Sequence, residues 1–385
     1  MKIAYIHNIA MPGREANTVN VAKMCSAMAA LGHEVTLIAA DSGRGGDFAM
    51  RLQHFYGLEH RFAAVALPGY GVKPTLGAAH GAMTALRSGA QLVWTRAPHA
   101  ALAACSAGIP TLLELHTDLS AFSALGRHAF QATVKHRNLV CVVVISTALA
   151  AYVAEECPHL SGRIIVAHDG ADDHFAAPAS PRTDATPLSV GYVGSLYRGK
   201  GVELIEALAS ISPDRFTVVG AGGEDRQSRA NLTYRPPVSH AEVPALLSKF
   251  DVLIAPYQRS VIAADGRTDT ARWMSPLKLF EYMAARRPIL TSDLPVIREI
   301  LGNGETALLR APEDVESWAQ ALDALRSDNA LGSALAERAY RAFRTHHTWT
   351  ARADTILREV AELRRPSARR QTTRNRPVEE TRPPL

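Results

Sequence analysis

Short apolar runs alternate with longer segments of helical character through the first half of the chain. The run at 2–7 is apolar enough for a buried strand, and 17–31 carries a helical pattern that ends before Gly32. Further strands are predicted at 34–40, 63–67, 91–95, 111–114 and 139–145. Strands that alternate with helices favour a parallel, doubly wound sheet, because each return to a parallel neighbour needs a crossover connection.

The same pattern restarts after a segment rich in proline. Residues 176–187 contain three prolines and no large apolar side chain, which is typical of a linker. Strands are then predicted at 188–193, 216–219, 252–256 and 289–292, followed by helices. We therefore predict an α/β protein with two Rossmann-like, doubly wound domains, at 1–175 and 188–348, facing a central cleft. A helix at 349–365 and a disordered basic tail at 366–385 are predicted to follow.

The composition is that of a globular protein with sizeable cores, since 47% of the 385 residues are hydrophobic and 21% are charged. The positive charge is concentrated in the tail. Residues 364–385, which are the tail and the two residues before it, contain seven Arg and two Glu, and their net charge equals the formal +5 of the whole chain. Because the tail lacks aromatic residues on which bases could stack, no nucleic-acid partner is predicted.

The location of the protein is predicted from its cysteines and its apolar stretches. The four cysteines have no metal-like spacing and are predicted to be buried, reduced thiols. The longest apolar stretch, 139–154, is too polar and too short for a membrane span, which needs about 20 residues. A cytoplasmic protein is predicted, with peripheral contact at the inner face of a membrane left open. Residues 122–138 place Arg127, Lys135 and Arg137 among apolar side chains, which fits either a basic amphipathic patch or a solvated helix face.

The segment 275–284 reads as a helix whose start can hold an anion. Ser275 is predicted as the N-cap and Pro276 as part of the first turn, where a missing N–H costs nothing. The free N–H groups of that turn, around Leu277, and the charge of Lys278 would together attract a phosphate. Glu281 could accept two hydroxyl hydrogen bonds, as a ribose would offer. The alternative is a capped amphipathic helix with an ordinary Lys278–Glu281 ion pair.

The same segment closely resembles the donor-binding helix of the retaining GT-B glycosyltransferases of family 4. In that family a glutamate, seven residues and a second glutamate precede a helix of small residues and a strand. Here Glu281 matches the second glutamate, and Trp273 stands where the first would fall. The resemblance extends from about residue 1 to about 362, and it implies that the last helix packs back on the first domain.

Two segments of the second half add candidate donor-binding residues. The loop 194–201 follows a predicted strand, and its glycines would let the backbone approach a diphosphate that Arg198 and Lys200 neutralise; a solvated basic turn is the alternative. The resemblance assigns diphosphate binding to Lys200. It also implies that the backbone of Val238 contacts the nucleobase.

Two segments of the first half add further candidates. The turn around Gly13 follows the first strand, and His116 ends a strand on the side of the predicted cleft. From the residues alone, a surface turn is as consistent as a ligand loop, and a structural role for His116 is favoured. The resemblance places Gly13 near the donor diphosphate and His116 near the transferred sugar.

These residues together predict a retaining glycosyltransferase that moves a sugar from a UDP- or GDP-linked donor to a glycan or lipid-linked acceptor. His116, Lys200 and Glu281 are its predicted catalytic residues, and Gly13, Arg198, Val238, Ser275, Pro276, Leu277 and Lys278 its predicted donor-binding residues. No D-x-D motif occurs in the sequence, so neither a metal nor a cofactor is predicted. Two alternatives remain open, a sugar-nucleotide epimerase with the same fold and a nucleotide-sugar-binding subunit without catalysis.

Overall fold

The computed structural model describes residues 1–43, 45–67, 74–173, 187–222, 226–263 and 266–365. The strands of the first half are β1 (Lys2–Ile6), β2 (Glu34–Ala39), β3 (Ala63–Ala66), β4 (Leu92–Thr95), β5 (Thr111–Leu115), β6 (Leu139–Val144) and β7 (Ile164–Val166). Those of the second half are β8 (Ser189–Val193), β9 (Arg215–Val219), β10 (Leu232–Arg235), β11 (Val252–Ala255), β12 (Ile289–Ser292) and β13 (Leu308–Arg310). Of the predicted linker only residue 187 is described, and the tail 366–385 lies outside the described residues.

Helices separate these strands along the chain. The first half contains α1 (Ala16–Ala30), α2 (Phe48–Tyr56), α3 (Pro74–Arg87), α4 (Pro98–Ser106), α5 (Ala124–Val134) and α6 (Thr147–Glu156). The second half contains α7 (Val202–Ile211), α8 (Val243–Leu247), α9 (Leu277–Ala284), α10 (Pro295–Arg298), α11 (Val315–Ser327), α12 (Asn329–Ala342) and α13 (Trp349–Leu363). Short helical turns lie at η1 (Leu119–Ala121), η2 (Pro158–Leu160), η3 (His240–Glu242) and η4 (Phe343–His347). None of the described helices combines the length and the apolar character that crossing a bilayer requires.

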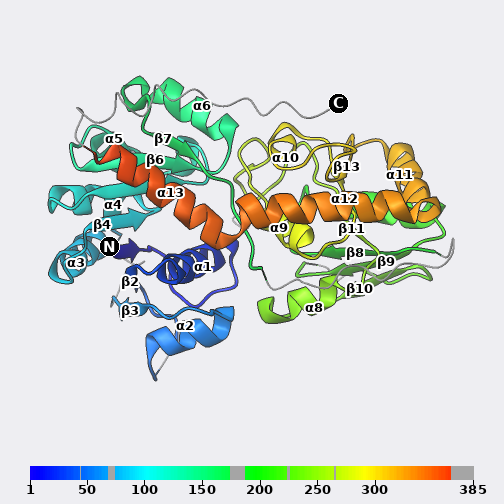
Figure 1. The fold of residues 1–385 in the computed structure, drawn as a ribbon, viewed down its shortest axis with the longest axis horizontal. Coiled ribbons are helices and arrows are strands. Elements are labelled where there is room, and N and C mark those ends of the chain that lie inside the picture. The colour runs from blue at the N-terminus through cyan, green and yellow to red at the C-terminus, as the bar shows by residue number, and fades with distance from the viewer. Residues whose placement is uncertain (44, 68–73, 174–186, 223–225, 264–265, 366–385) are drawn as a thin grey trace.

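The strands form two parallel sheets, one in each half, with helices on both faces (Figure 1). The order is β3-β2-β1-β4-β5-β6-β7 in the first sheet and β10-β9-β8-β11-β12-β13 in the second. This arrangement confirms the predicted fold class, two doubly wound domains. The order reverses between β1 and β4 in the first sheet and between β8 and β11 in the second, and such points are where open α/β sheets bind ligands.

Three strands, β7, β10 and β13, were not predicted from the sequence. Each lies at the edge of its sheet and has only three or four residues. Edge strands are only partly covered, so they lack the continuous apolar run by which the central parallel strands can be recognised.

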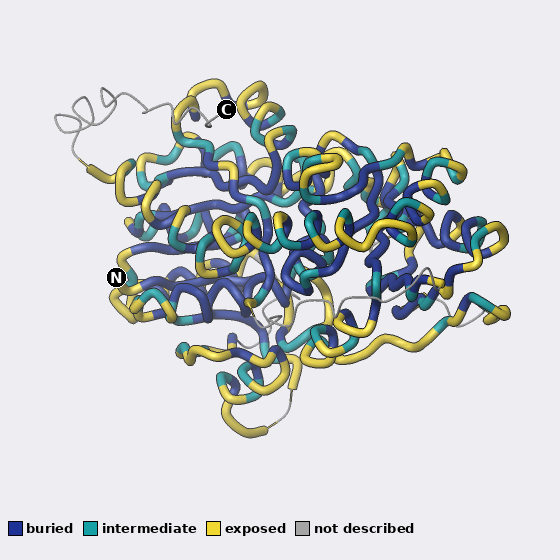
Figure 2. Tube along the Cα trace, turned by 45° about the vertical axis from the view of Figure 1, so that its right-hand side comes forward, coloured by how far each residue is buried: buried dark blue, intermediate teal, exposed yellow. Residues whose placement is uncertain are grey.

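The faces of the first sheet pack against different helices. Ile3 and Tyr5 of β1 belong to the core beneath α1 and α13, whereas Ala4 and Ile6 belong to the core beneath α3 and α4. The buried strands form the inner layer of each domain, and the covering helices expose their outer sides (Figure 2). All four cysteines are buried free thiols, as predicted.

The last helix, α13, returns from the second domain to the first and packs against α1 (Figure 1). Its apolar residues recur at helical spacing and join the core of the first domain: Trp349, Ala353, Ile356, Leu357 and Val360. The first domain is therefore completed by a segment from the far end of the chain, and that segment brings Arg352 into the interior.

Candidate functional site

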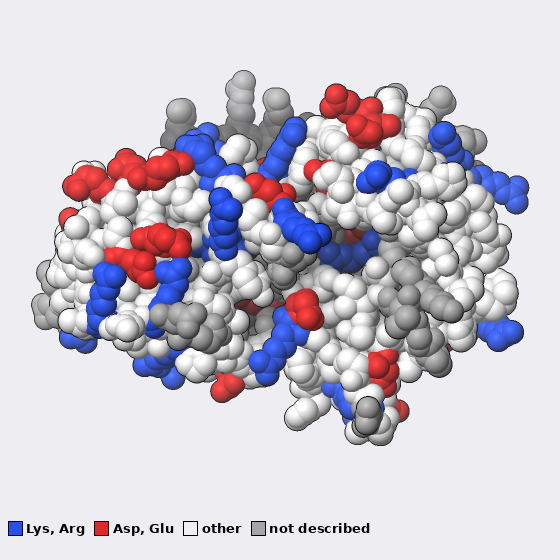
Figure 3. All heavy atoms as spheres, turned by 180° about the vertical axis from the view of Figure 1, so that it is seen from behind, with Lys and Arg blue, Asp and Glu red and all other residues white. Residues whose placement is uncertain are grey.

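The two domains meet at a cleft onto which the carboxyl ends of both sheets open. The back of the molecule is hollowed between the two halves, and Lys or Arg atoms lie deep in the hollow (Figure 3). Residues from both sides bridge the domains near this cleft. The N–H of Asp169 donates to Ser275 Oγ at 2.8 Å, and Trp273 Nε1 donates to Asp118 Oδ2 at 3.0 Å.

Two lysines of the second domain, Lys200 and Lys278, lie together and form no ion pair with a carboxylate of the described residues. Lys278 Nζ is buried, has no hydrogen-bond partner among the described residues, and lies 3.6 Å from the centre of the Tyr192 ring. Lys200 Nζ and Lys278 Nζ lie 5.2 and 5.4 Å from the centre of the Tyr257 ring. Burial lowers the pKa of Lys200 to about 8, and burial together with the charge of Lys200 lowers the pKa of Lys278 well below its usual value. A bound anion would stabilise the protonated form of both lysines.

The alternative of a Lys278–Glu281 ion pair is not what the structure contains. Glu281 Oε1 lies 3.7 Å from His240 Nδ1, and Lys278 forms no ion pair within the described part of the chain. The two side chains, although three positions apart on one helix, are therefore available to different parts of a ligand.

The predicted start of this helix was wrong by one residue. Helix α9 begins at Leu277, with Pro276 as the N-cap and no side-chain cap. Ser275 is instead buried, and its hydroxyl accepts the N–H of Asp169, so it joins the domains rather than capping the helix. Because no side chain among the described residues caps α9, the N–H groups of its first turn, at Leu277 and Lys278, are available to bind an anion.

The glycine loop before α7 brings Lys200 to this place. Gly199 and Gly201 both have positive φ, and a Cβ on either would lie within 2 Å of a backbone oxygen of the segment 256–260. Glycine is therefore required for the loop to pack closely. At the start of the loop, a Cβ on Gly194 would lie 2.8 Å from Lys278 Nζ, so the backbone passes directly over that lysine. Arg198, in contrast, is exposed.

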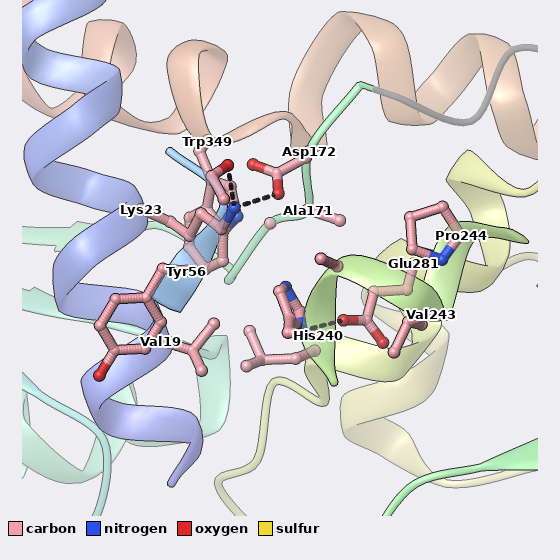
Figure 4. A pocket seen from close by; sticks show the side chains of 14 residues that line it. Val19, Lys23, Tyr56, Ala171, Asp172, His240, Val243, Pro244, Glu281 and Trp349 are labelled. Atoms are coloured by element: carbon pink, nitrogen blue, oxygen red, sulfur yellow. Dashed lines mark hydrogen bonds and ion pairs between the residues drawn. The ribbon is translucent and has the colours of Figure 1, made fainter. Parts of the chain in front are cut away.

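A pocket of about 280 Å³ lies between the domains beside Glu281 (Figure 4). The first domain contributes Val19, Lys23 and Tyr56, the second contributes His240, Leu277 and Glu281, and Trp349 of α13 also lines it. Figure 4 shows the Glu281 carboxylate directed toward His240, across from Tyr56.

The loops at Gly13 and Val238 lie on opposite domains. The hydroxyl of Tyr56 accepts the N–H of Gly13 at 2.8 Å and donates to its carbonyl at 2.9 Å, which fixes the loop after β1. Val238 is 37% exposed and precedes a capping box formed by Ser239 and Glu242. None of the described residues bonds the backbone of Val238, so that backbone is available to a nucleobase.

His116 is held by a buried charge network. Its Nε2 lies 2.6 Å from Glu114 Oε1, and Arg352 Nη2 of α13 donates to the same oxygen at 2.9 Å. Trp94 Nε1 donates to Glu114 Oε2 at 2.6 Å. Burial would raise the pKa of Glu114, but Arg352 and the hydrogen bond from His116 outweigh it and hold that pKa far below its usual value. Glu114 is therefore an ionised acceptor.

The same network sets the protonation of His116. Burial and the charge of Arg96 lower the pKa of His116, although Asp169 and Glu114 oppose them, so the neutral ring is favoured near pH 7. The ionised Glu114 can only accept a hydrogen bond, so the proton of the neutral His116 ring is on Nε2, and Nδ1 is the unprotonated nitrogen. Nδ1 lies 4.0 Å from Asp169 Oδ2, beyond hydrogen-bond distance, and can accept a substrate hydroxyl.

Glu114, His116 and Asp169 are close enough to offer a metal ion three ligand atoms within 4.8 Å of one another. However, Arg352 Nη2 already lies 2.9 Å from Glu114 Oε1 and 3.9 Å from Asp169 Oδ1. A guanidinium in that place neutralises the carboxylates and disfavours a second cation. The absence of a metal stays a prediction.

Trp273, at the position of the family's first glutamate, is 3% exposed and packs into the core of the first domain. Its ring centre lies 5.4 Å from that of Tyr152, and its Nε1 donates to Asp118. The side chain therefore joins the domains and offers no carboxylate to a donor sugar.

Several residues of the site were missed in the sequence. Arg352 lies 238 positions from Glu114, and no local pattern links them. Arg96 could have been found, because it directly follows the apolar strand β4 as His116 follows β5.

Two Rossmann-like domains that face each other across a cleft are the architecture of GT-B proteins. Residues 18–175 match the family described as "Glycosyltransferase Family 4", and residues 187–328 match "Glycosyl transferases group 1". The chain belongs to this family, the group 1 or family 4 glycosyltransferases.

Solved structures with the same fold cover nearly the whole chain. A glycosyltransferase from Rickettsia africae superposes with a TM-score of 0.71 at 15% identity, covering 95% of this chain and 99% of its own. Sucrose-phosphate synthase from Thermosynechococcus elongatus gives a TM-score of 0.69 at 17% identity over 94% and 98%. Anabaena Alr3699/HepE, solved in complex with UDP-glucose, gives 0.65 at 16% identity over 94% and 99%. These likenesses establish the fold.

Among curated proteins, glycogen synthase of Mycobacterium tuberculosis is 28% identical over 221 residues, which are 52% of this chain and 49% of that protein. The alignment with the curated relative thus spans about half the length of each.

Proposed function

We propose that this protein is a retaining glycosyltransferase that transfers a sugar from a nucleoside diphosphate sugar to a glycan or lipid-linked acceptor, without a metal or cofactor. The observation that carries the proposal is the pair of lysines, Lys200 and Lys278, beside the uncapped start of α9. Two cations that lack a carboxylate partner within the described residues suit the diphosphate of a donor.

The chemistry follows from where charge develops. As the bond between the sugar and the diphosphate breaks, negative charge grows on the leaving phosphate, and Lys200, Lys278 and the N–H groups at Leu277 are placed to stabilise it. His116 is neutral, with Nδ1 free to accept a sugar hydroxyl, so its role is to orient the sugar. Transfer to the same face then leaves the departing phosphate as the base nearest the acceptor hydroxyl.

Glu281 suits the ribose of the donor. It lies one helical turn from Lys278, it is free of that lysine, and it lines the interdomain pocket with His240. Val238, on the loop just before η3, offers its backbone to the base. UDP is the first nucleotide to test, because Anabaena HepE was solved with UDP-glucose.

A donor screen tests the proposal. UDP, GDP and their glucose conjugates are added to the full chain, and the shift in melting temperature is recorded with and without EDTA. A true donor at 100 times its Kd should stabilise the protein by about 2.7 kcal/mol. Stabilisation by none of these nucleotides would refute the proposal.

Turnover separates the alternatives. NMR of the sugar released by slow donor hydrolysis should show the donor's own anomeric configuration first, whereas the opposite anomer would exclude a retaining mechanism. A changed nucleotide sugar formed without acceptor would indicate an epimerase. Tight binding with no hydrolysis and no transfer would indicate a binding subunit.

A further inference from the structure

Three nitrogen-bearing side chains lie in a row at the carboxyl edge of the first sheet. His7 follows β1, Arg96 follows β4 and His116 follows β5, and these strands are neighbours. Tyr5 pairs with Trp94, and each lies two positions before its basic residue. Since side chains two positions apart share a face of a strand, His7, Arg96 and His116 extend the face that carries Tyr5 and Trp94.

Electrostatic coupling supports this placement. Burial and, after it, the charge of Arg96 lower the pKa of His116 against the opposing effect of Asp169 and Glu114, and the same two causes lower the pKa of His7 to about 3. Both rings are then neutral near pH 7, and Arg96 is the fixed positive charge between them.

Arg96 forms no side-chain hydrogen bond or ion pair in the part of the chain that the structure describes, although its charge acts on the Glu114 carboxylate. Its Nη1 is buried and unbonded, and the nearby carboxylate of Glu114 is already held by Arg352 and His116. Both ring nitrogens of His7 and the hydroxyl of Thr117 are also buried without a partner. Buried polar atoms in native proteins are normally bonded, so the unbonded nitrogens of Arg96 and His7, at the ends of neighbouring strands, point to a bonding partner from outside the chain.

The position of this cluster is that of a ligand site. Strand order reverses between β1 and β4, and ligands of open α/β sheets bind outside the strand ends at that point. The cluster belongs to the first domain, on the side of the cleft opposite the lysine pair that we assign to the donor. Within the row, His116 is the residue assigned to the donor sugar. Arg96 and His7 follow the neighbouring strands β4 and β1, so they are left for the other substrate.

We propose that Arg96, with His7 beside it, binds an anionic group, a phosphate or carboxylate, on the acceptor sugar. A guanidinium suits such groups because its planar N–H donors match their paired oxygens. This inference rests on the proposed function, since it takes the cleft to hold a sugar donor on its opposite side. It narrows the acceptor to sugars that carry a negative charge near the reacting hydroxyl.

The test is a titration of the full chain in the presence of saturating UDP. The bound UDP fills the donor site, so the phosphate of a sugar probe cannot bind there. Glucose 6-phosphate, glucuronate and neutral glucose are the probes, and calorimetry gives each Kd. Glucose 6-phosphate or glucuronate should bind at least about 10-fold more tightly than glucose, as expected for a charged hydrogen bond. Which of the two binds better decides between phosphate and carboxylate.

Variants assign the effect to Arg96. Arg96→Gln should weaken binding of the charged probe by roughly 10- to 100-fold, Arg96→Lys by less, and Arg61→Gln, at an exposed arginine of the same domain, not at all. Circular dichroism and the affinity for UDP should stay unchanged in all three, because Arg96 Nη1 is unbonded and the Arg96 side chain forms no ion pair with a described residue whose loss would unfold the protein.

The results separate this inference from the proposed function. UDP binding with no preference for charged sugars, or with a preference that survives Arg96→Gln, overturns the inference and leaves the function standing. A loss of UDP affinity in Arg96→Gln places the residue at the donor and also overturns it. Failure of the unaltered chain to bind any nucleotide refutes the proposed function instead.

Discussion

Replacing Lys278 with methionine should weaken nucleotide binding and stabilise the free protein. Methionine keeps most of the aliphatic chain that packs beside Tyr192 but removes the charge. The ammonium is buried without a hydrogen-bond partner among the described residues. Removing such a charge from water costs several kcal/mol, and the contact with the Tyr192 ring, which contributes up to about 2 kcal/mol, offsets only part of that cost. The substitution should therefore lower the affinity for the nucleotide and raise the stability of the free protein, two effects that are seldom combined.

The magnitudes follow from the same contacts. A hydrogen bond between a charged donor and phosphate contributes about 1.5–3 kcal/mol, so the Kd for UDP should rise by roughly 10- to 100-fold. If removing the buried charge gains a net ~1 kcal/mol, the melting temperature of this 385-residue protein should rise by roughly 1 °C, because the shift per kcal/mol falls as the chain lengthens.

The gain in stability should also depend on pH. Burial lowers the pKa of Lys278 in the folded chain below its usual 10.5, so the unfolded state binds more protons between those two values. The unaltered protein therefore gains stability as pH rises through that range, and the advantage of Lys278→Met should shrink accordingly.

Calorimetric titration with UDP and thermal melts at several pH values measure both effects. Lys249→Met, at an exposed lysine of the same domain, is the matched control and should change neither. An unchanged Kd would remove Lys278 from the donor site. A lower melting temperature together with weaker binding would show that the charge is satisfied in the free protein, and the reasoning from its burial would be wrong.

Four further predictions concern other parts of the molecule. Lys200→Ala should lower turnover by about 100-fold or more, and UDP affinity of the unaltered protein should fall above pH 8, where Lys200 loses its proton; flat affinity from pH 7 to 10 would contradict this. Glu281→Gln should weaken UDP binding with an unchanged melting temperature, and the reverse pattern would make Glu281 structural. Arg352→Met leaves Glu114 as a buried unpaired carboxylate and should cost about 3–5 kcal/mol of unfolding free energy in urea, whereas a loss below ~1 kcal/mol would show that the pair is not needed. If the acceptor is lipid-linked, the basic patch at 122–138 and the tail should bind anionic vesicles by about 1 kcal/mol per basic residue and release them at high salt, and equal sedimentation with neutral vesicles would exclude docking.

Much of the candidate site could be found from local sequence because its parts lie on short, recognisable units. Lys200 sits in a glycine loop after a strand, Lys278 and Glu281 share one helix, and His116 ends a strand. The prediction that failed was the exact first residue of helix α9, an error smaller than one helical turn. Ser275 has the chemistry of an N-cap, but its hydroxyl bonds Asp169 of the other domain, and α9 starts at Leu277.

The contact partners of Lys278 and Glu281 could not be predicted from their spacing in the sequence. Lys278 and Glu281 are three positions apart, which favours an ion pair on an isolated helix. In the folded chain Lys278 turns under the loop at Gly194 and over Tyr192, and Glu281 turns to His240. Which contact forms depends on the elements packed around the helix, and those come from elsewhere in the chain.

The sequence by itself determined the two parallel sheets, because the apolar runs and crossover helices of a parallel sheet are local, periodic features. It also placed the site at the carboxyl ends of the strands, since topology requires that. Only the tertiary structure decided the charge state and partners of the site. Arg352 reaches Glu114 because α13 packs back on the first domain, Trp273 joins the domains, and Arg96 is left without an acceptor among the described residues. The physical reason is that burial and pairing of charges depend on distances between distant segments, and no local pattern in the chain encodes those distances.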